Sequence, residues 1–250
     1  DDGHLGCPYF KPDFSIDLLR NNNYLCHMLT VRKSLLDSVG PIPAGYDGAQ
    51  DHYMTLRISE ETDRVYHVPK VLYHWRATAG STALVADNKP YATEAGIRAV
   101  QSHLDRIGID AEVVQYKDRP FTYQPIYKLK DKPKVSILIP SRDSREYLKK
   151  CIESVFNKST YQNIEVLIIE NNSVDSATFD YYKTLEAEYD NIQILTWTEE
   201  SDFNFSKLIN FGAHRADGEY LLLLNNDIEV ISEDWIETML GFCQRKDVGA

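Results

Sequence analysis

Residues 218–227, with the sequence GEYLLLLNND, decide the fold that we predict for this chain. Four consecutive leucines between a glycine and a polar cluster are typical of a strand buried on both faces, as in parallel sheets. We therefore predict that this strand lies in the middle of a sheet. Its carboxyl end would carry Asn225, Asn226 and Asp227 to the edge where open α/β sheets bind their ligands.

Asp227 has two interpretations at this point. A carboxylate at the end of a core strand suits a divalent cation that is shared between the protein and a phosphate group. Alternatively, the Asn-Asn-Asp sequence is only a turn that caps the next helix, because Ser232 and Glu233 open an apolar-periodic run through Trp235 and Leu240. The neighbouring strands decide between the two interpretations.

From residue 134 onward, predicted strands alternate with predicted helices. This alternation indicates right-handed crossovers and a parallel sheet, so the expected fold class is α/β and Rossmann-like, with helices flanking the sheet. The chain has no G-x-G-x-x-G after the first strand and no G-x-x-x-x-G-K-[ST], which argues against a dinucleotide cofactor and a P-loop nucleotidase. The predicted strands are 135–139, 164–169, 192–195 and 220–224, and the predicted helices are 146–156, 175–189, 204–216 and 232–245.

The residues before 134 have a less regular pattern. Apolar spacing predicts helices, whereas Val- and Tyr-rich runs on either side of Pro69 predict a strand and its continuation. The stretch 131–134, DKPK, is the clearest linker. We predict helices at 31–39 (with Leu35 and Leu36 facing inward), 50–61 and 89–107, strands at 65–69 and 71–75, and short strands at 111–116 and 121–129.

The composition limits the class of protein. A net charge of −11 argues against nucleic-acid binding through a basic surface, but a local cluster of cations can still bind a small anion. Cys7, Cys26, Cys151 and Cys243 are too far apart for a zinc-type pair and do not suggest a disulfide framework, which favours a reducing, cytoplasmic compartment. No apolar run approaches the roughly 20 residues of a membrane span. Both ends look cut, so we expect a piece of a longer polypeptide.

Polar groups follow the ends of the predicted strands. The first strand is followed by 140–143 (PSRD), the second by 170–175 (ENNSVD) and the leucine strand by 225–227 (NND). Each cluster alone is explained by a helix cap, and we expect Asp175 to be one. Together, on one edge of a sheet, the three clusters indicate a ligand site.

These segments resemble a known family. VSILIPSRD, EVLIIENNSVD and NFSKLINFGAHRADGEYLLLLNND are similar to family-two glycosyltransferases of the GT-A fold, in particular to tandem-domain bacterial enzymes that build rhamnose-containing or O-antigen polysaccharides. The resemblance implies that residues 134–250 are the nucleotide-sugar-binding half of such a domain.

The front of the chain resembles the other half of a family-two domain. CPYFKPDFS, GYDGAQDHYMTLR and VPKVLYHWRATAGSTA are similar to an acceptor-binding half, which implies that 1–107 have this role and that 108–133 are a linker with short strands. The halves then follow one another in permuted order, across the junction of two tandem domains. We expect them to fold onto each other, with His74 and Asp51 facing Asp227 in one composite cleft.

The resemblance also implies roles for single residues. Asp51 matches the catalytic base that takes a proton from the acceptor hydroxyl, with the N-cap of the 50–61 helix as the alternative. His74 and Asp227 match the ligands of a divalent cation, Mn²⁺ or Mg²⁺. Asn225 stands where the family has the first carboxylate of Asp-x-Asp, and its amide oxygen can still coordinate a cation.

Other residues match the binding surfaces of the family. Glu170 stands where an aspartate usually contacts the nucleotide base, and Lys207 and Arg142 are the best candidates for screening the diphosphate. The nucleotide-sugar set is Pro140, Ser141, Asp143, Glu170, Asn172, Ser173, Lys207 and Asn226, and the acceptor set is Gln50, Trp75 and Arg76.

The function that the resemblance implies is an inverting, metal-dependent transfer of a sugar from a nucleoside diphosphate to a cell-surface polysaccharide. The partners would be the donor and a glycan or lipid-linked glycan acceptor, in the cytoplasm or at the inner face of the membrane. The alternative is a noncatalytic nucleotide-sugar or glycan-binding module with a degenerate metal site, which Asn225 supports. A sugar nucleotidyltransferase fits less well, because the glycine- and lysine/arginine-rich loop expected after the first strand is missing.

Overall fold

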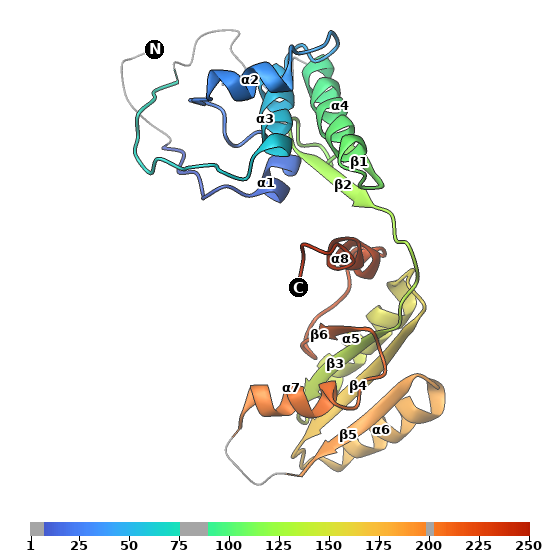
Figure 1. The fold of residues 1–250 in the computed structure, drawn as a ribbon. Helices are drawn as coiled ribbons and strands as arrows, with labels where there is room; N and C mark the ends of the chain where they lie inside the picture. The colour runs from blue at the N-terminus through green and yellow to red at the C-terminus, as the bar shows by residue number, and fades with distance from the viewer. Residues whose placement is uncertain (1–7, 76–89, 199–202) are drawn as a thin grey trace. The chain divides into compact units, whose positions relative to one another are not determined.

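A computed structural model describes residues 8–75, 90–198 and 203–250. The chain forms two compact units, Asp1–Lys128 and Leu129–Ala250 (Figure 1).

The second unit is built on a parallel sheet. Its strand order is β5-β4-β3-β6, and every neighbouring pair is parallel. The α/β class and the parallel sheet flanked by helices are therefore confirmed for this unit. The strands are β3 (Val135–Ser141), β4 (Ile164–Asn171), β5 (Ile192–Trp197) and β6 (Tyr220–Leu223).

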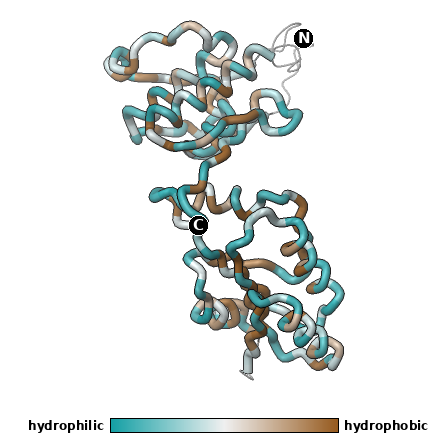
Figure 2. The backbone as a smooth tube through the Cα atoms, turned by 90° about the vertical axis from the view of Figure 1, so that its right-hand side faces the viewer, coloured by the Kyte–Doolittle hydropathy of each residue, from teal (hydrophilic) through white to brown (hydrophobic). Residues whose placement is uncertain are grey.

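Helices cover both faces of this sheet. One core contains Ile137 and Ile168 from the strands and side chains of α5 (Arg145–Lys158), α6 (Ser176–Glu188) and α8 (Trp235–Cys243). The other core joins Leu138 and Leu167 to α7 (Phe205–Ala213). Figure 2 shows the hydrophobic residues of these strands in brown. The continuous apolar runs of β3 and β4 are thus explained by burial on two faces.

The leucine strand is not where we predicted it. β6 pairs only with β3 and lies at one end of the sheet in the described part of the chain. The exposed fractions of Leu221 and Leu223 are 48% and 54%, whereas Leu222 and Leu224 pack on the core. The physical reason is that α7 packs against β3, β4 and β5, so the second face of β6 has no helix over it within the described residues. The middle strands are β3 and β4.

β3 also continues through Pro140, where we predicted its end. The Leu138 carbonyl accepts a hydrogen bond from the Leu224 backbone N–H (3.0 Å), so the backbone polar groups of Leu138 point toward β6. Because every second residue of a strand has the same orientation, the backbone of Pro140 also faces the β6 side. Pairing with β6 ends at Leu138. At Pro140, β3 therefore has no paired strand on the side where the backbone N–H would point. The absence of this N–H breaks no hydrogen bond of the sheet, so β3 tolerates the proline.

The start of β6 is held by the amino end of β3. The Gly218 N–H donates to Ser136 Oγ (2.8 Å), and a Cβ at Gly218 would lie 2.5 Å from the same oxygen. Buried Glu165 accepts hydrogen bonds from Ser136 Oγ and from the Asp217 N–H (2.7 Å), and it pairs with Lys134 (2.9 Å). Only glycine fits this close approach of two backbones.

The first unit is a small helical layer with a hairpin. Strands β1 and β2 are antiparallel, and β1 packs against α4. The predicted helices at 50–61 and 89–107 and the two short strands are confirmed. The hairpin thus belongs to the compact first unit, which extends to Lys128. The elements are α1 (Ile16–Asn21), α2 (Lys33–Val39), α3 (Gln50–Glu61), α4 (Pro90–Arg106), β1 (Ala111–Gln115) and β2 (Tyr123–Tyr127).

Two expectations for this unit are wrong. The stretch 65–75 contains no strand, and the side chains of Tyr66, Val71 and Leu72 are 86%, 63% and 62% exposed. No strand pairs with this stretch in the described residues, so its β-type residues are not enough to form one. Leu36, predicted to face inward in α2, is 39% exposed, and Val39 is the buried residue of that helix.

Candidate functional site

The carboxyl ends of β3 and β4 form a polar edge in the second unit. Ser141 and Glu170 are direct neighbours in the β3–β4 register, and both side chains are buried. The turn 171–175 follows β4 and lies against the turn that follows β3, because the Asp143 N–H donates to Ser173 Oγ (2.9 Å). The edge therefore has the position that ligand sites take in open α/β sheets.

Glu170 is the centre of this edge. Its carboxylate accepts hydrogen bonds from the Ser173 N–H (2.5 Å), the Ser173 hydroxyl (2.5 Å) and the Tyr182 hydroxyl (2.9 Å). Glu170 is only 2% exposed. A buried carboxylate with three donors holds its surroundings firmly, because each bond to a charged acceptor is stronger than a neutral one. Glu170 therefore fixes the turn after β4 and attaches it to α6.

Asp143 organises the same turn from the other side. Its Oδ1 accepts hydrogen bonds from the backbone N–H groups of Val174 and Asp175, both at 2.9 Å. Asp143 and Asn172 have φ values of 52° and 57°, which Asp and Asn tolerate better than most residues. Asp175 in turn caps α6 by accepting from the Ala177 N–H (3.0 Å), so the predicted cap is confirmed.

The segment after β6 reaches the same edge. Asn226 Nδ2 donates to Ser141 Oγ (3.3 Å), while the side chains of Asn225 and Asp227 are exposed. The N-cap of α8 is Asp234, so Asn225–Asp227 do not cap that helix and the capping interpretation is wrong. The structure thus places Asp227 on the edge that also carries Glu170, Asp143 and Ser173.

The donor set around Asp227 suits a cation that also binds phosphate. Among the described residues, no three His, Cys, Asp or Glu side chains come together as a metal cage. Asn225 and Asp227 offer an amide oxygen and a carboxylate, and Mg²⁺ is typically held by one or two carboxylates together with substrate phosphates. The residues present therefore fit a shared cation and not a cation held by protein alone.

The predicted cations lie on the exterior. Arg142 follows β3 and is exposed, and Lys207 is exposed in the first turn of α7. The Lys207 N–H donates to the Asn204 side chain (3.0 Å), which caps the helix. Since α7 follows β5 in a parallel sheet, its amino end belongs to the carboxyl side of that sheet.

In the first unit, Asp51 is exposed in the first turn of α3. The N-cap of α3 is Ala49, without a side-chain cap, and Gln50 is the first, exposed residue of the helix. The alternative that Asp51 is the N-cap is therefore wrong. Burial raises the pKa of the Cys26 thiol, and the negative charge of Asp51 acts in the same direction, which places the carboxylate near this thiol.

Aromatic rings gather near Cys26. The ring of His27 lies 5.3 Å from Trp75 and 5.6 Å from Tyr73, measured between centroids. Trp75 and Tyr73 remain about half exposed, and His74 is exposed between them. Arg76 lies outside the described residues. Tyr73 could have been suspected from its place two residues before Trp75, whereas no sequence signal pointed to His27.

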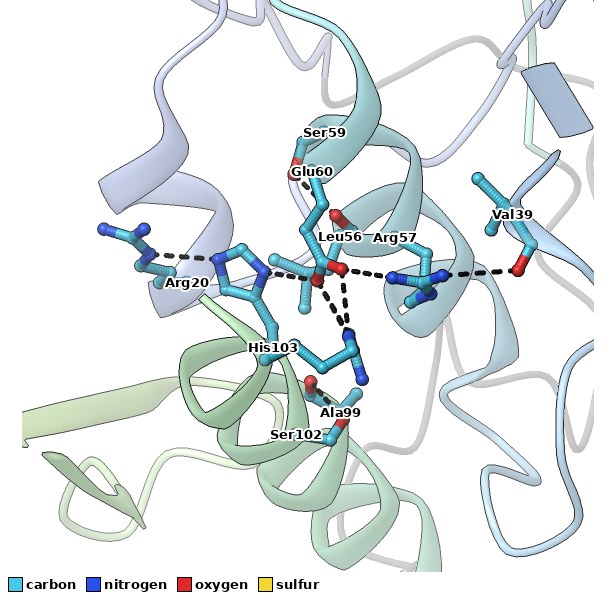
Figure 3. A network of polar contacts seen from close by, with 10 residues as sticks. Arg20, Val39, Leu56, Arg57, Ser59, Glu60, Ala99, Ser102 and His103 are labelled. Atoms are coloured by element: carbon cyan, nitrogen blue, oxygen red, sulfur yellow. Dashed lines mark hydrogen bonds and ion pairs between the residues drawn. The ribbon is translucent and has the colours of Figure 1, made fainter. Parts of the chain in front are cut away.

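A partly buried ion network in the first unit was not predicted from the sequence (Figure 3). The Glu60 carboxylate accepts from His103 Nδ1 (2.8 Å), pairs with Arg106 (2.7 Å) and pairs with Arg57. Arg20 Nε donates to His103 Nε2 (3.3 Å). Burial acts to raise the pKa of Glu60, but the contacts with Arg106, His103 and Arg57 together outweigh burial and lower this pKa. The network joins α1, α3 and α4, and its partners are too far apart in sequence to form a motif.

The prediction that His74 shares a cation with Asp227 joins residues of the two units. It stays a prediction.

The second unit is thus an α/β domain with a parallel sheet and a hydrogen-bonded polar edge at the carboxyl ends of its strands. Residues 136–250 match the family described as Glycosyl transferase family 2. This match identifies residues 136–250 as a domain of that family of glycosyltransferases.

Relatives match nearly the whole chain. The O-antigen biosynthesis protein RfbC of Myxococcus xanthus is 38% identical over 99% of the chain, which spans 19% of that protein. The protein y4gI of Sinorhizobium fredii is 37% identical over 96% of the chain, which spans 26% of that protein. The chain therefore spans about a fifth to a quarter of these relatives.

Solved structures match the chain less closely. A mannosyltransferase from Pyrobaculum calidifontis, PcManGT in complex with GDP-Man and Mn²⁺, has a TM-score of 0.43 and 15% identity. The alignment covers 48% of this chain and 35% of the mannosyltransferase chain.

No helix in the described residues is long and apolar enough to cross a membrane.

Proposed function

We propose that the unit Leu129–Ala250 binds a nucleoside diphosphate sugar at the carboxyl edge of its sheet, and that the protein transfers the sugar to a cell-surface polysaccharide. One observation carries the proposal: β3, β4 and the segment after β6 bring polar groups to a single hydrogen-bonded edge. Family membership of residues 136–250 supports the reaction class.

The nucleotide would lie along the two turns that follow β3 and β4. Because Glu170 already accepts three hydrogen bonds from the protein, we assign it the shaping of the turn, and not a strong bond to the base. The exposed residues of these two turns would then contact the base and the ribose. The residues that would line the nucleotide-sugar site are Pro140, Ser141, Asp143, Asn172, Ser173 and Asn226.

The diphosphate would lie near Asp227. Asp227 and Asn225 would hold a Mn²⁺ or Mg²⁺ ion. When bound, such an ion neutralises the charge that develops on the departing diphosphate. Lys207 and Arg142 would add positive charge from the protein itself.

Asp51 would act as the general base. The acceptor hydroxyl loses a proton as its oxygen attacks the anomeric carbon, and a single displacement inverts the configuration there. An exposed carboxylate in the first turn of a helix can take up that proton. Gln50, Trp75 and Arg76 would bind the glycan or lipid-linked glycan acceptor, in the cytoplasm or at the inner face of the membrane.

The test is a titration of the chain with UDP, GDP and dTDP, with and without Mn²⁺. We expect Mn²⁺-dependent binding of one of them, weakened at least about 10-fold by Asp227→Asn because a ligand of the cation loses its charge. Asp217→Asn is the matched control, since Asp217 lies before β6, at the opposite end of that strand. Absence of nucleotide binding under all conditions would refute the proposal.

A second candidate is a noncatalytic nucleotide-sugar or glycan-binding module, favoured by Asn225 in place of a carboxylate. Donor hydrolysis or transfer separates the two. Mn²⁺-dependent binding without either reaction, in the full-length protein, would favour the module.

A further inference from the structure

The segment 225–230 lies along one face of α5. Three residues of this helix contact it: Cys151, Ser154 and Lys158, at spacings of three and four residues. Residues at such spacings share one face of a helix. We call these three residues the α5 anchor.

The contacts of the α5 anchor are directional. Cys151 Sγ donates to the Asn225 carbonyl at 3.7 Å, a usual length for a bond with sulfur. Ser154 Oγ accepts from the Val230 N–H (3.0 Å) and donates to the Cys151 carbonyl (2.9 Å). Lys158 Nζ donates to the Val230 carbonyl (3.0 Å). The segment is therefore held at its beginning and at its end.

Burial makes the first two contacts matter most. Cys151 and Ser154 are 0% and 4% exposed, whereas the Lys158 side chain is 45% exposed. A buried N–H that loses its acceptor costs the free energy of its desolvation, and water does not replace the bond. Ser154 is thus the strongest single point of attachment.

Side chains in the anchored segment alternate in exposure. Asn225, Asp227 and Glu229 are exposed, whereas Asn226, Ile228 and Val230 are partly or fully buried. The buried members pack on Ser141 and the hydrophobic core. Anchoring the backbone at 225 and 230 therefore sets where the Asn225 and Asp227 side chains project.

We propose that the α5 anchor positions Asn225 and Asp227 for cation binding. This inference rests on the proposed function. Cys151, Ser154 and Lys158 would touch neither the cation nor the nucleotide, so they are positioning residues. Ser154 would act by holding the Val230 backbone and Cys151 by holding the Asn225 backbone.

The experiment compares Ser154→Ala and Cys151→Ala in the whole chain, with Cys243→Ala on α8 as the control. We expect the apparent affinity for Mn²⁺ with the nucleoside diphosphate that the wild type binds to fall by about 2- to 12-fold, the range for one lost hydrogen bond. Ser154→Thr keeps the hydroxyl and is expected to restore most of the affinity. Cys243→Ala should leave it unchanged.

Amide hydrogen exchange gives a second measurement that needs no ligand. We expect faster exchange in 225–230 for Ser154→Ala, with β4 unchanged. Unchanged exchange in this segment would overturn the anchor itself, and faster exchange with unchanged Mn²⁺ affinity would overturn its role in cation binding. A wild type that exchanges slowly at 225–230 but binds no Mn²⁺ would instead refute the proposed function, and the cation role with it.

Discussion

Replacing Glu170 by Gln should destabilise the second unit. Glutamine is nearly the same size but has one acceptor oxygen where the carboxylate has two. Its oxygen can still accept from the Ser173 N–H, but the hydroxyls of Ser173 and Tyr182 lose a charged acceptor. Since hydrogen bonds to charged groups contribute about 1.5–3 kcal/mol and neutral ones about 1, we expect a loss of about 1–3 kcal/mol.

The assay is urea unfolding followed by tryptophan fluorescence. Trp197 and Trp235 lie in the second unit and Trp75 in the first, so a Trp75→Phe background reports the second unit alone. With a slope of about 2 kcal/mol per M, the midpoint should fall by about 0.5–1.5 M.

Glu153→Gln is the matched control. The Glu153 side chain is 51% exposed and pairs with Lys149 at 3.8 Å, so the midpoint should stay within about 0.3 M. A Glu170→Gln midpoint equal to the control would refute the reasoning. If nucleotide affinity fell while stability stayed constant, Glu170 would be a direct ligand of the base and not the support of the turn.

Two further predictions concern the first unit. Asp51→Asn in the full-length protein should lower turnover by about 10²–10⁴-fold with little change in donor affinity, because it removes the proton acceptor. Steady-state kinetics, with Asp47→Asn as the control, measures this effect. Unchanged turnover would contradict the role of Asp51 as the base. His52 is 2% exposed, donates from Nε2 to the Leu19 carbonyl (2.7 Å), and burial lowers its pKa to about 4. Between about pH 6.5 and 4 the unfolded chain therefore binds more protons than the folded chain, so the free energy of unfolding should fall by up to about 1.4 kcal/mol for each unit of decreasing pH. In urea unfolding across this pH range, His52→Gln should make the free energy of unfolding less dependent on pH. An unchanged pH dependence would contradict the prediction.

Local patterns in the sequence predicted most of the elements. Apolar runs located β3 and β4, and the residue before α6 identified Asp175 as its cap. The strand–turn boundaries also predicted that the clusters after β3, β4 and β6 meet on one edge. These features depend on neighbours in sequence, whose geometry a strand or helix transmits directly.

Other parts of the site could not be read from the pattern. The contact of Glu170 with the nucleotide base stays a prediction, and only the structure shows that its carboxylate accepts hydrogen bonds from Ser173 and Tyr182. His27 approaches Trp75 across 48 positions, and Cys151 approaches Asn225 across 74. No repeating pattern in the local sequence predicts such contacts, because each of them depends on how separate helices and loops pack.

The sequence by itself determined the α/β class of the second unit, the order of its strands and helices, and the polar residues at the strand ends. Only the tertiary structure decided that the leucine strand β6 lies at the end of the described sheet with Leu221 and Leu223 half exposed. The physical reason is that hydrophobicity makes a strand suitable for burial, whereas actual burial depends on which helices cover it. α7 covers β3, β4 and β5, so β6 is buried on the α5 face alone among the described residues.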